Sequence, residues 1–283
     1  MASRKIGHLI ADNKRLRDIE YALTTSTAQK CGLLSRPRLG VLFFRADSFE
    51  DDAIRESVSE DYALGERLGV IYVVPGGSFD RADIRAGDQL LEVDGKATGT
   101  ADEFLDLMLE TSERDSIEVL LQRGGERLER SVRLAAGCPV QFALSTNAQL
   151  IARRTTRLMV IVPMGVMRLV DDDDALAVVL AHELAHALFD DKEESWPVQE
   201  ARADRYGLLI AASAGYEVAG AVAYWEAVAS EYPWLIDDGP DSSRPLWKGW
   251  HSYAHFGIAQ RIAAIRSTVR EIEARLAEGA SSP

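Results

Sequence analysis

The sequence lacks the long apolar runs that helices crossing a membrane require. No segment has eighteen uninterrupted apolar residues, and the most apolar one, residues 158–167, contains Pro163. The first residues also lack the apolar core of a signal peptide, so they do not reveal a compartment. We therefore expect no transmembrane span in this chain.

Positive charge is also in short supply. The 283 residues include 32 Lys and Arg against 45 Asp and Glu, which gives a net charge of -13. Proteins that bind nucleic acid through a broad surface need excess positive charge there to neutralise the phosphates. We therefore expect no nucleic-acid partner.

Cysteine occurs only twice, as Cys31 and Cys138. Two cysteines are too few for a disulfide-rich scaffold, and these lack the paired spacing of a thiolate zinc site. On this count alone, they are either two buried thiols or one bridge.

The patterns that are present indicate an α+β protein of more than one domain. Residues 10–30 have the apolar spacing of a helix, and we expect the segment 1–35 to pack on the last domain. Short β-rich runs separated by Gly, Asp and Pro predict a β-rich domain over residues 36–135. Residues 136–283 predict a mainly helical domain with a small sheet. Its last helix has one apolar stripe, formed by Ile258, Ile262, Ile265, Val269, Ile272 and Leu276.

The segment His182-Glu-Leu-Ala-His186 lies in a run of helix formers, after four aspartates that suit a helix N-terminus. Residues four apart share a helix face, so the two histidines can bind one metal ion while Glu183 stands beside it. We predict one Zn²⁺ per chain at this position. The alternative is a pair of histidines on a half-buried helix face beside a surface glutamate.

A catalytic zinc site needs a third protein ligand. Glu193 and Glu194 lie in a polar stretch that looks like a solvated loop, whereas Glu200 opens an apolar helix and Asp204 follows one turn later. A carboxylate on a packed helix needs a partner, which zinc would supply. Asp204 can accept the remaining imidazole N–H of a ligand histidine. Without the histidines, both acids would be read as an ordinary solvated stripe.

The sequence HELAH followed by EARAD resembles the prenyl-protease and HtpX family of gluzincin metallopeptidases, which carry HExxH followed by ExxxD. The lead-in over residues 167–180 is also similar, and the resemblance covers roughly residues 139–276. It implies a zincin-type fold and a zinc peptidase site, with His182, His186 and Glu200 as ligands, Glu183 as general base and acid, and Asp204 as the partner of a ligand histidine. In such a site zinc lowers the pKa of water toward ~7, so that Glu183 takes a proton during attack on the peptide carbonyl and passes it to the leaving amine.

A second motif of that family is matched in part by four residues, His255, Phe256, Arg261 and Ile262. In the family a proline usually follows the histidine, where this chain has Phe256. We expect His255 to donate to the oxyanion or to approach the open position of the metal in a resting state. His251 is the other candidate, and a histidine that merely packs between helices is the structural alternative.

The segments Val73-Val-Pro-Gly-Gly-Ser78 and Ala86-Gly-Asp-Gln-Leu-Leu-Glu-Val-Asp-Gly-Lys96 resemble PDZ domains of the HtrA type. The resemblance covers residues 36–134 and implies that an extended peptide adds a strand beside a helix, its C-terminal carboxylate bound by backbone N–H groups. The residues implied are Leu39, Gly40 and Val41 in the carboxylate loop and Phe104, Leu105 and Met108 along the groove. Alternatively, these side chains are core and the chain itself fills the groove.

Cys31 and Cys138 flank this PDZ segment, so a bridge would clamp the points where the chain enters and leaves an inserted domain. We therefore predict a disulfide between them. Such a bond indicates an oxidising compartment, for which a bacterial periplasm or cell envelope is the best candidate.

Two functions are consistent with these resemblances. The first is a zinc-dependent endopeptidase that cleaves protein or peptide substrates in envelope protein quality control, with a PDZ domain that selects them, in part through their C-termini. The second is a PDZ-based adaptor or regulator whose zinc site is structural or inactive. Glu183 favours the first function, because a purely structural site needs no general base.

Overall fold

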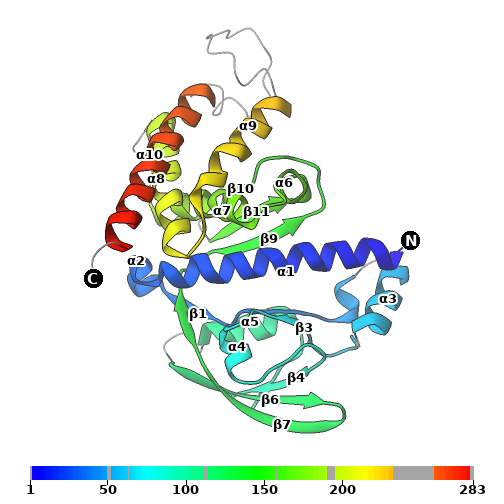
Figure 1. Cartoon of the computed structure of the whole chain (residues 1–283). Helices are drawn as coiled ribbons and strands as arrows, with labels where there is room; N and C mark the ends of the chain where they lie inside the picture. The colour runs from blue at the N-terminus through cyan, green and yellow to red at the C-terminus, as the bar shows by residue number, and fades with distance from the viewer. Residues whose placement is uncertain are drawn as a thin grey trace. The chain divides into compact units, whose positions relative to one another are not determined.

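The computed structural model describes residues 2–49, 52–62, 64–110, 114–156, 158–189, 195–231 and 258–280. The chain folds into two compact units, residues 1–139 and 140–283 (Figure 1). Both units combine helices with strands. None of the helices in the described ranges is long and apolar enough to cross a membrane.

The first unit combines one long and several shorter helices with a β-rich fold. In chain order its elements are α1 (Ala2–Ser26), α2 (Ala28–Cys31), β1 (Arg36–Arg38), β2 (Val41–Phe44), α3 (Asp52–Tyr62), β3 (Gly69–Val73), α4 (Ser78–Arg81), β4 (Gln89–Val93), β5 (Lys96–Ala97), α5 (Ala101–Glu110), β6 (Ser116–Arg123), β7 (Glu126–Arg133) and β8 (Ala135–Gly137).

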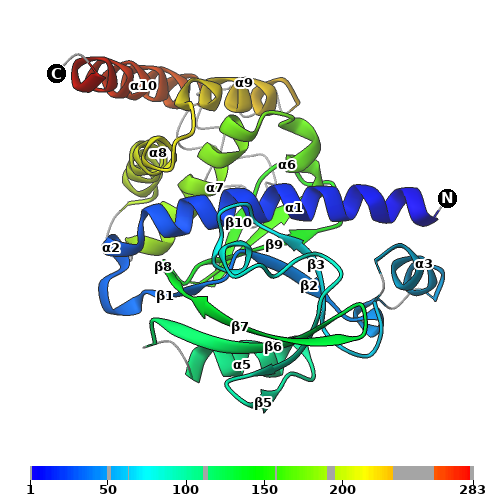
Figure 2. The ribbon, with the colours of Figure 1, turned by 60° about the horizontal axis from the view of Figure 1, so that its bottom comes forward.

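The main sheet of this unit has the strand order β2-β3-β4-β6-β7, with β5 paired to β4, and its neighbouring strands are antiparallel. Alternation along β6 turns Ile117, Val119 and Leu121 into the core. Helix α5 packs against the sheet through Phe104, which belongs to the same core cluster (Figure 2). Strands β1 and β8 form a separate two-stranded ribbon.

Helix α1 belongs to this first unit. The packing of residues 1–35 on the last domain, expected from the sequence, stays a prediction. Ile6 and Ile10 enter a core cluster with Leu42, Val58 and Ile71, so α1 packs against β2, β3 and α3. The helix also begins at Ala2, earlier than predicted, because the apolar stripe that reaches Ile10 continues back to Ile6.

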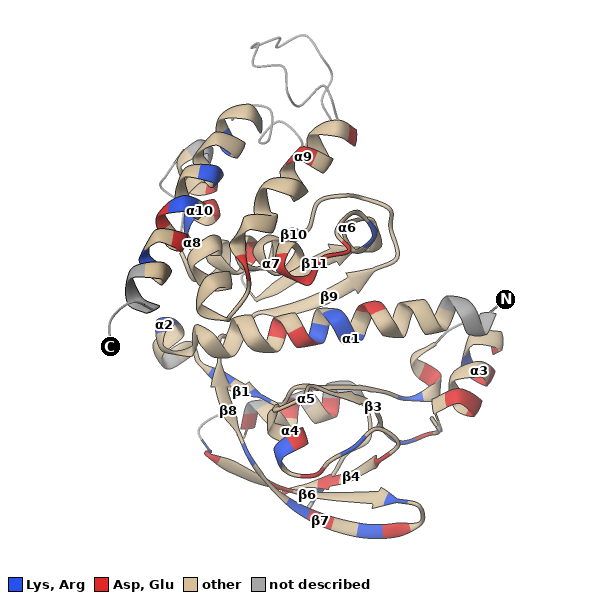
Figure 3. Cartoon of the chain, in the orientation of Figure 1, with Lys and Arg blue, Asp and Glu red and all other residues tan. Residues whose placement is uncertain are grey.

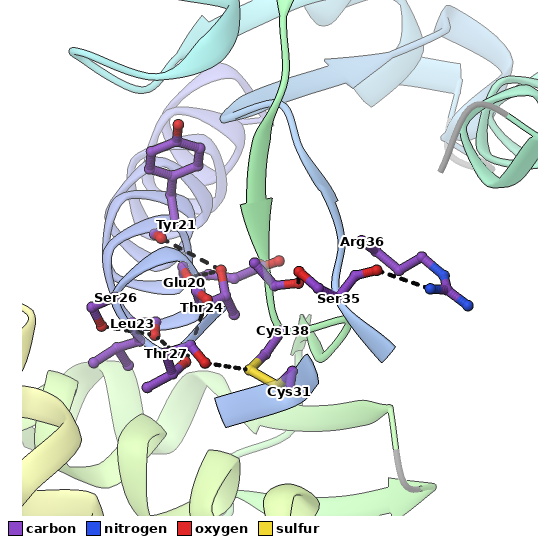
Figure 4. The surroundings of a disulfide bond; sticks show 11 residues. Glu20, Tyr21, Leu23, Thr24, Ser26, Thr27, Cys31, Ser35, Arg36 and Cys138 are labelled. Atoms are coloured by element: carbon purple, nitrogen blue, oxygen red, sulfur yellow. Dashed lines mark hydrogen bonds between the residues drawn. A yellow bond between two sulfur atoms is a disulfide. The ribbon is translucent and has the colours of Figure 1, made fainter. Parts of the chain in front are cut away.

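The predicted disulfide is confirmed. Cys31 at the end of α2 is bonded to Cys138, just after β8, with their Cα atoms 5.5 Å apart (Figure 4). The Cys138 N–H also donates to the Thr24 carbonyl oxygen at 2.9 Å, and the Ser35 hydroxyl donates to the Gly137 carbonyl oxygen at 3.2 Å. The bridge therefore fastens the end of the helical segment to the ribbon through which the chain enters and leaves the main sheet.

The second unit is mainly helical. Its elements are β9 (Gln141–Ser145), β10 (Arg153–Thr156), β11 (Met159–Pro163), α6 (Met164–Leu169), α7 (Asp173–Leu188), α8 (Trp196–Ser213), α9 (Ala221–Glu231) and α10 (Ile258–Ala280). The small sheet has the order β10-β11-β9, in which β9 runs parallel to β11 and β10 runs antiparallel to it.

Helix α7 is the buried centre of this unit. The Asp172 carboxylate caps its N-terminus by accepting from the Ala175 N–H at 3.0 Å, as the aspartate run predicted. All residues from 175 to 187 are buried. Helix α8 approaches α7 very closely at Gly207, where an added Cβ would lie 2.8 Å from the backbone nitrogen of His182. A side chain at position 207 would therefore force the two helices apart.

The predicted apolar stripe of α10 is largely confirmed. Ile265, Val269 and Ile272 are buried and Ile262 is partly buried, but Leu276 is 60% exposed. Acidic and basic residues are interspersed along β7 and along α10 (Figure 3).

Candidate metal centre

The two histidines of the HELAH segment lie on one face of α7. His182 and His186 are each 8% exposed, and their Nε2 atoms lie 3.1 Å apart. The spacing of four residues on a helix produces this convergence. Two imidazoles therefore point at one small volume inside the second unit.

Glu200 reaches the same volume from the first turns of α8. Its carboxylate is 2% exposed; Oε1 lies 3.0 Å from Nε2 of His186, and Oε2 lies 3.4 Å from Nε2 of His182. The ligand atoms of the three residues all fall within 4.8 Å of one another. Glu193 and Glu194, the other candidates for third ligand, lie outside the described residues.

The three residues fit a tetrahedral zinc ion. Two ligand atoms bound at 2.0–2.1 Å to such an ion are about 3.4 Å apart, close to the 3.0–3.4 Å separations in this cluster. In addition, Oε2 of Glu200 is buried and has no hydrogen bond with any described residue. The Arg261 guanidinium lies 3.0 Å from this oxygen without a hydrogen bond, so the oxygen is free to bind a metal ion beside the two imidazole nitrogens.

Asp204 fixes the orientation of one histidine ring. Its Oδ1 lies 3.0 Å from Nδ1 of His182, so the ring presents its Nε2 atom to His186 and Glu200. Burial by itself would raise the pKa of Asp204, but the charge of Arg261 and the hydrogen bond with His182 lower it below its ordinary value. Asp204 therefore remains a carboxylate that accepts the His182 N–H.

The charges of His182 and Glu200 are strongly coupled. Burial alone would lower the pKa of His182, but hydrogen bonds with Asp204 and Glu200 raise it to about 10. Burial alone would raise the pKa of Glu200, yet hydrogen bonds and attraction from the two histidines and Arg261 hold it far below its ordinary value. A metal ion that binds here would displace the proton from His182.

Glu183 is the next residue on α7 and is 6% exposed. Burial raises the pKa of its carboxyl group, and nearby His182 and His186 only partly oppose this. A carboxyl group with a raised pKa holds a proton more readily than an exposed glutamate does, which suits a group that must accept and then release one.

Arg261, at the start of α10, completes the cluster and was not predicted as a site residue. It is 3% exposed, and its Nε and Nη2 atoms each donate to an oxygen of Asp204 at 2.7 Å. Its guanidinium also stacks over the Trp225 ring, with 3.7 Å from Cζ to the ring centroid. One signal was available, since Arg261 precedes the buried Ile265 by four residues and so lies on the apolar stripe of α10.

The second histidine motif cannot be placed. His255, expected to act as oxyanion donor or resting-state ligand, and its alternative His251 lie outside the described residues. Both remain predictions from the sequence.

A pocket adjoins the cluster on the Glu183 side. Its walls are mostly apolar, with two site residues and Asp204 among them: Ile151, Ala152, Val178, Val179, His182, Glu183, Asp204, Leu208, Ala221, Tyr224, Trp225 and Ile265. The Arg154 side chain of β10 donates to the His186 carbonyl oxygen at 2.6 Å, which ties the small sheet to the end of α7. The pocket therefore has rigid elements on several sides.

The first unit carries the residues expected to bind a peptide. Leu39, Gly40 and Val41 precede or begin β2, and Gly40 has a positive φ of +67°. Phe104 and Met108 of α5 belong to the core cluster and are 1% and 8% exposed; the side chain of Leu105 is not described. β2 ends the strand order, and no strand in the described part of the chain pairs with its outer edge.

Comparison with known proteins identifies this fold. Residues 69–123 match a family model described as PDZ domain, so the first unit contains a PDZ domain. The match spans β3 to β6 and includes α5, the helix that would border a bound peptide. A search of curated proteins found no match.

Solved structures with local similarity include a serine endoprotease, a PDZ domain and an HtrA-type protease. A serine endoprotease from Yersinia pestis is 22% identical over 36% of this chain and 30% of its own, with a TM-score of 0.27. The HtrA3 PDZ domain bound to a phage-derived ligand is 15% identical over 36% of this chain and 88% of its own, with a TM-score of 0.30. The HtrA-type protease AlgW with a decapeptide is 19% identical over 36% of this chain and 30% of its own, with a TM-score of 0.29. This chain thus spans less than a third of the length of these two proteases.

Proposed function

We propose that this protein is a zinc-dependent endopeptidase whose PDZ domain binds its protein or peptide substrates. The observation that carries the proposal is the position of Glu183, a buried carboxyl group next to the converged side chains of His182, His186 and Glu200. A structural metal site would not need this fourth group.

Each residue of the cluster would have a different role in the proposed reaction. Zinc held by the two histidines and Glu200 would lower the pKa of a bound water toward ~7 and polarise the substrate carbonyl. Glu183 would accept the proton of that water and then deliver it to the leaving amine, a sequence that its raised pKa favours. Asp204 would keep His182 in the tautomer that presents Nε2.

One further feature supports a peptide substrate. The PDZ domain leaves the outer edge of β2 without a partner among the described strands, so a peptide can add there as a further strand. The resemblance of HELAH and EARAD to gluzincins of the prenyl-protease and HtpX family also agrees with a peptide substrate.

The disulfide supports an oxidising location. A bond between Cys31 and Cys138 persists where thiols are not kept reduced. We therefore extend the proposal to the periplasm or cell envelope of a bacterium, with protein quality control as the role.

The test compares the wild-type protein with Glu183→Gln. We expect about one zinc per chain in both proteins by metal analysis, because residue 183 is not among the ligands. Cleavage of casein or of a permanently unfolded protein is expected in the wild type and is expected to fall by at least about 100-fold in the variant, since general acid–base groups contribute that much or more. Glu226→Gln, an exposed change on α9, serves as the control.

Two results would contradict the proposal. A zinc-loaded wild type that cleaves no substrate would favour the PDZ-based adaptor with a structural metal site. A wild type that cleaves but contains no zinc would remove the metal from the mechanism.

A further inference from the structure

Glu200 and Asp204 create an electrostatic problem in the protein without metal. They lie one turn apart on α8, and their side chains are only 2% and 9% exposed. Two carboxylates with so little access to water repel each other and lose hydration, which strongly disfavours the folded site unless cations compensate.

Arg261 meets both carboxylates at once. Its guanidinium makes a two-pronged interaction with Asp204, with both distances 2.7 Å, and its Nη2 atom lies 3.0 Å from Oε2 of Glu200. The Trp225 ring stacks against the guanidinium plane. Because an arginine in a protein does not lose its proton, this positive charge is permanent.

The contact with Glu200 differs in kind from the contact with Asp204. Asp204 is hydrogen-bonded to Arg261, whereas Oε2 of Glu200 is close to Arg261 but has no hydrogen bond with a described residue. Glu200 is therefore held by charge alone at this oxygen. It can turn toward a metal ion without breaking a hydrogen bond there.

From this geometry we propose that Arg261 is a built-in counter-ion that keeps the Glu200 and Asp204 carboxylates in place while no metal is bound. The inference rests on the proposed metal site. Arg261 is a positioning residue here, because it reaches the metal site through the two carboxylates. In the metal-free protein Arg261 supplies the positive charge that zinc supplies in the zinc-loaded protein. Removing Arg261 therefore lowers the stability of the metal-free protein more than that of the zinc-loaded protein.

The experiment measures thermal unfolding of the full chain with and without zinc. All five tryptophans lie in the second unit, so tryptophan fluorescence follows the unfolding of the unit that holds the site. In Arg261→Gln we expect the midpoint of the metal-free protein to fall more than that of the zinc-loaded protein. The increase in midpoint caused by zinc is then larger than in the wild type, by about 5 °C or more.

Two variants serve as controls. Arg261→Lys retains the positive charge but loses the two-pronged guanidinium geometry. We expect zinc to raise its unfolding midpoint by about as much as in the wild type. Arg205→Gln removes an arginine that also joins α8 to α10, through Glu271, but is 46% exposed. It should leave both midpoints nearly unchanged.

Each outcome is decisive. A zinc-induced increase in Arg261→Gln equal to or smaller than the wild-type value would assign Arg261 a packing role and overturn the inference. If Arg261→Gln folds only in the presence of zinc, the inference is supported. If neither Arg261→Gln nor Arg261→Lys folds with zinc, it is overturned. A wild type that binds no zinc contradicts the proposed function itself, and the inference falls with it.

Discussion

At the scale of single residues, the geometry of the candidate site depends on side chains that fix the orientation of other side chains. Asp204 contacts His182 on one side and Arg261 on the other, so it links helices α7, α8 and α10. Asp204 is not one of the three residues that could hold a metal ion. In the proposed zinc site, the affinity for metal is therefore set partly by a residue that does not bind the ion.

Asp204→Ala is expected to weaken zinc binding by about 10- to 100-fold, because His182 loses the acceptor that fixes its ring. Competition with a chromophoric chelator measures this change. Glu271→Ala, which removes an exposed carboxylate from α10, is the control and should leave the affinity unchanged. Equal affinities for Asp204→Ala and the wild type would show that packing alone orients His182.

The residues of the site differ in how far the sequence predicts them. The spacing of His182 and His186 determines a shared helix face, and Glu200 stands out as an acid on an apolar helix. Arg261 could not be assigned in the same way, because both of its partners are distant in the sequence. Asp204 lies 57 residues before it, and Trp225 lies on a different helix, α9. Its burial follows from how α8, α9 and α10 pack, which the local pattern does not specify.

At the scale of secondary structure, the close approach of α7 and α8 positions Glu200 against the two histidines. Gly207 makes the approach possible, because its missing side chain leaves room for the backbone at His182. Helix α7 could be predicted from its run of helix formers and from the aspartates that precede it. The contact at Gly207 could not, since a glycine within a helix pattern does not reveal which neighbour it accommodates.

Gly207→Ala is expected to push α8 away from α7 and lower the free energy of unfolding by about 1–3 kcal/mol, as overpacking usually does. Zinc affinity should fall as well, since Glu200 moves with α8. Chemical denaturation followed by circular dichroism, together with chelator competition, measures both effects.

The same substitution at Gly7 of α1 provides a matched control, because an added Cβ there meets nothing within 4 Å. We expect Gly7→Ala to leave stability unchanged or slightly higher, since alanine favours helix. Equal stability changes for Gly207→Ala and Gly7→Ala would show that α7 and α8 can accommodate a side chain at position 207, against the prediction.

At the scale of the whole molecule, the disulfide divides the chain into a ring and two free ends. Cys31 and Cys138 are 107 residues apart and both lie in the first unit. The position of the cysteines around the PDZ segment was enough to predict the bond. The place of α1 was not predictable in the same way, because an amphipathic helix shows that it packs but not on which domain.

The double variant Cys31→Ser and Cys138→Ser is expected to lose up to ~4.7 kcal/mol of stability in the first unit, the value of the chain-entropy model for a loop of about 100 residues. Urea denaturation followed by circular dichroism should show this loss. The tryptophan signal, which reports only on the second unit, should change little. Two reactive thiols in denatured, unreduced wild-type protein would contradict the bond and the prediction together.

The ring has a mechanical consequence. Tension applied between the two ends of the chain passes from Cys31 to Cys138 through the sulfur atoms and does not act on the strands of the PDZ domain. The 107 residue steps inside the ring would contribute about 370 Å to a fully stretched chain at roughly 3.5 Å per residue. While the bond is oxidised this length cannot be extended, so the PDZ domain does not bear a force that pulls on the two ends of the chain.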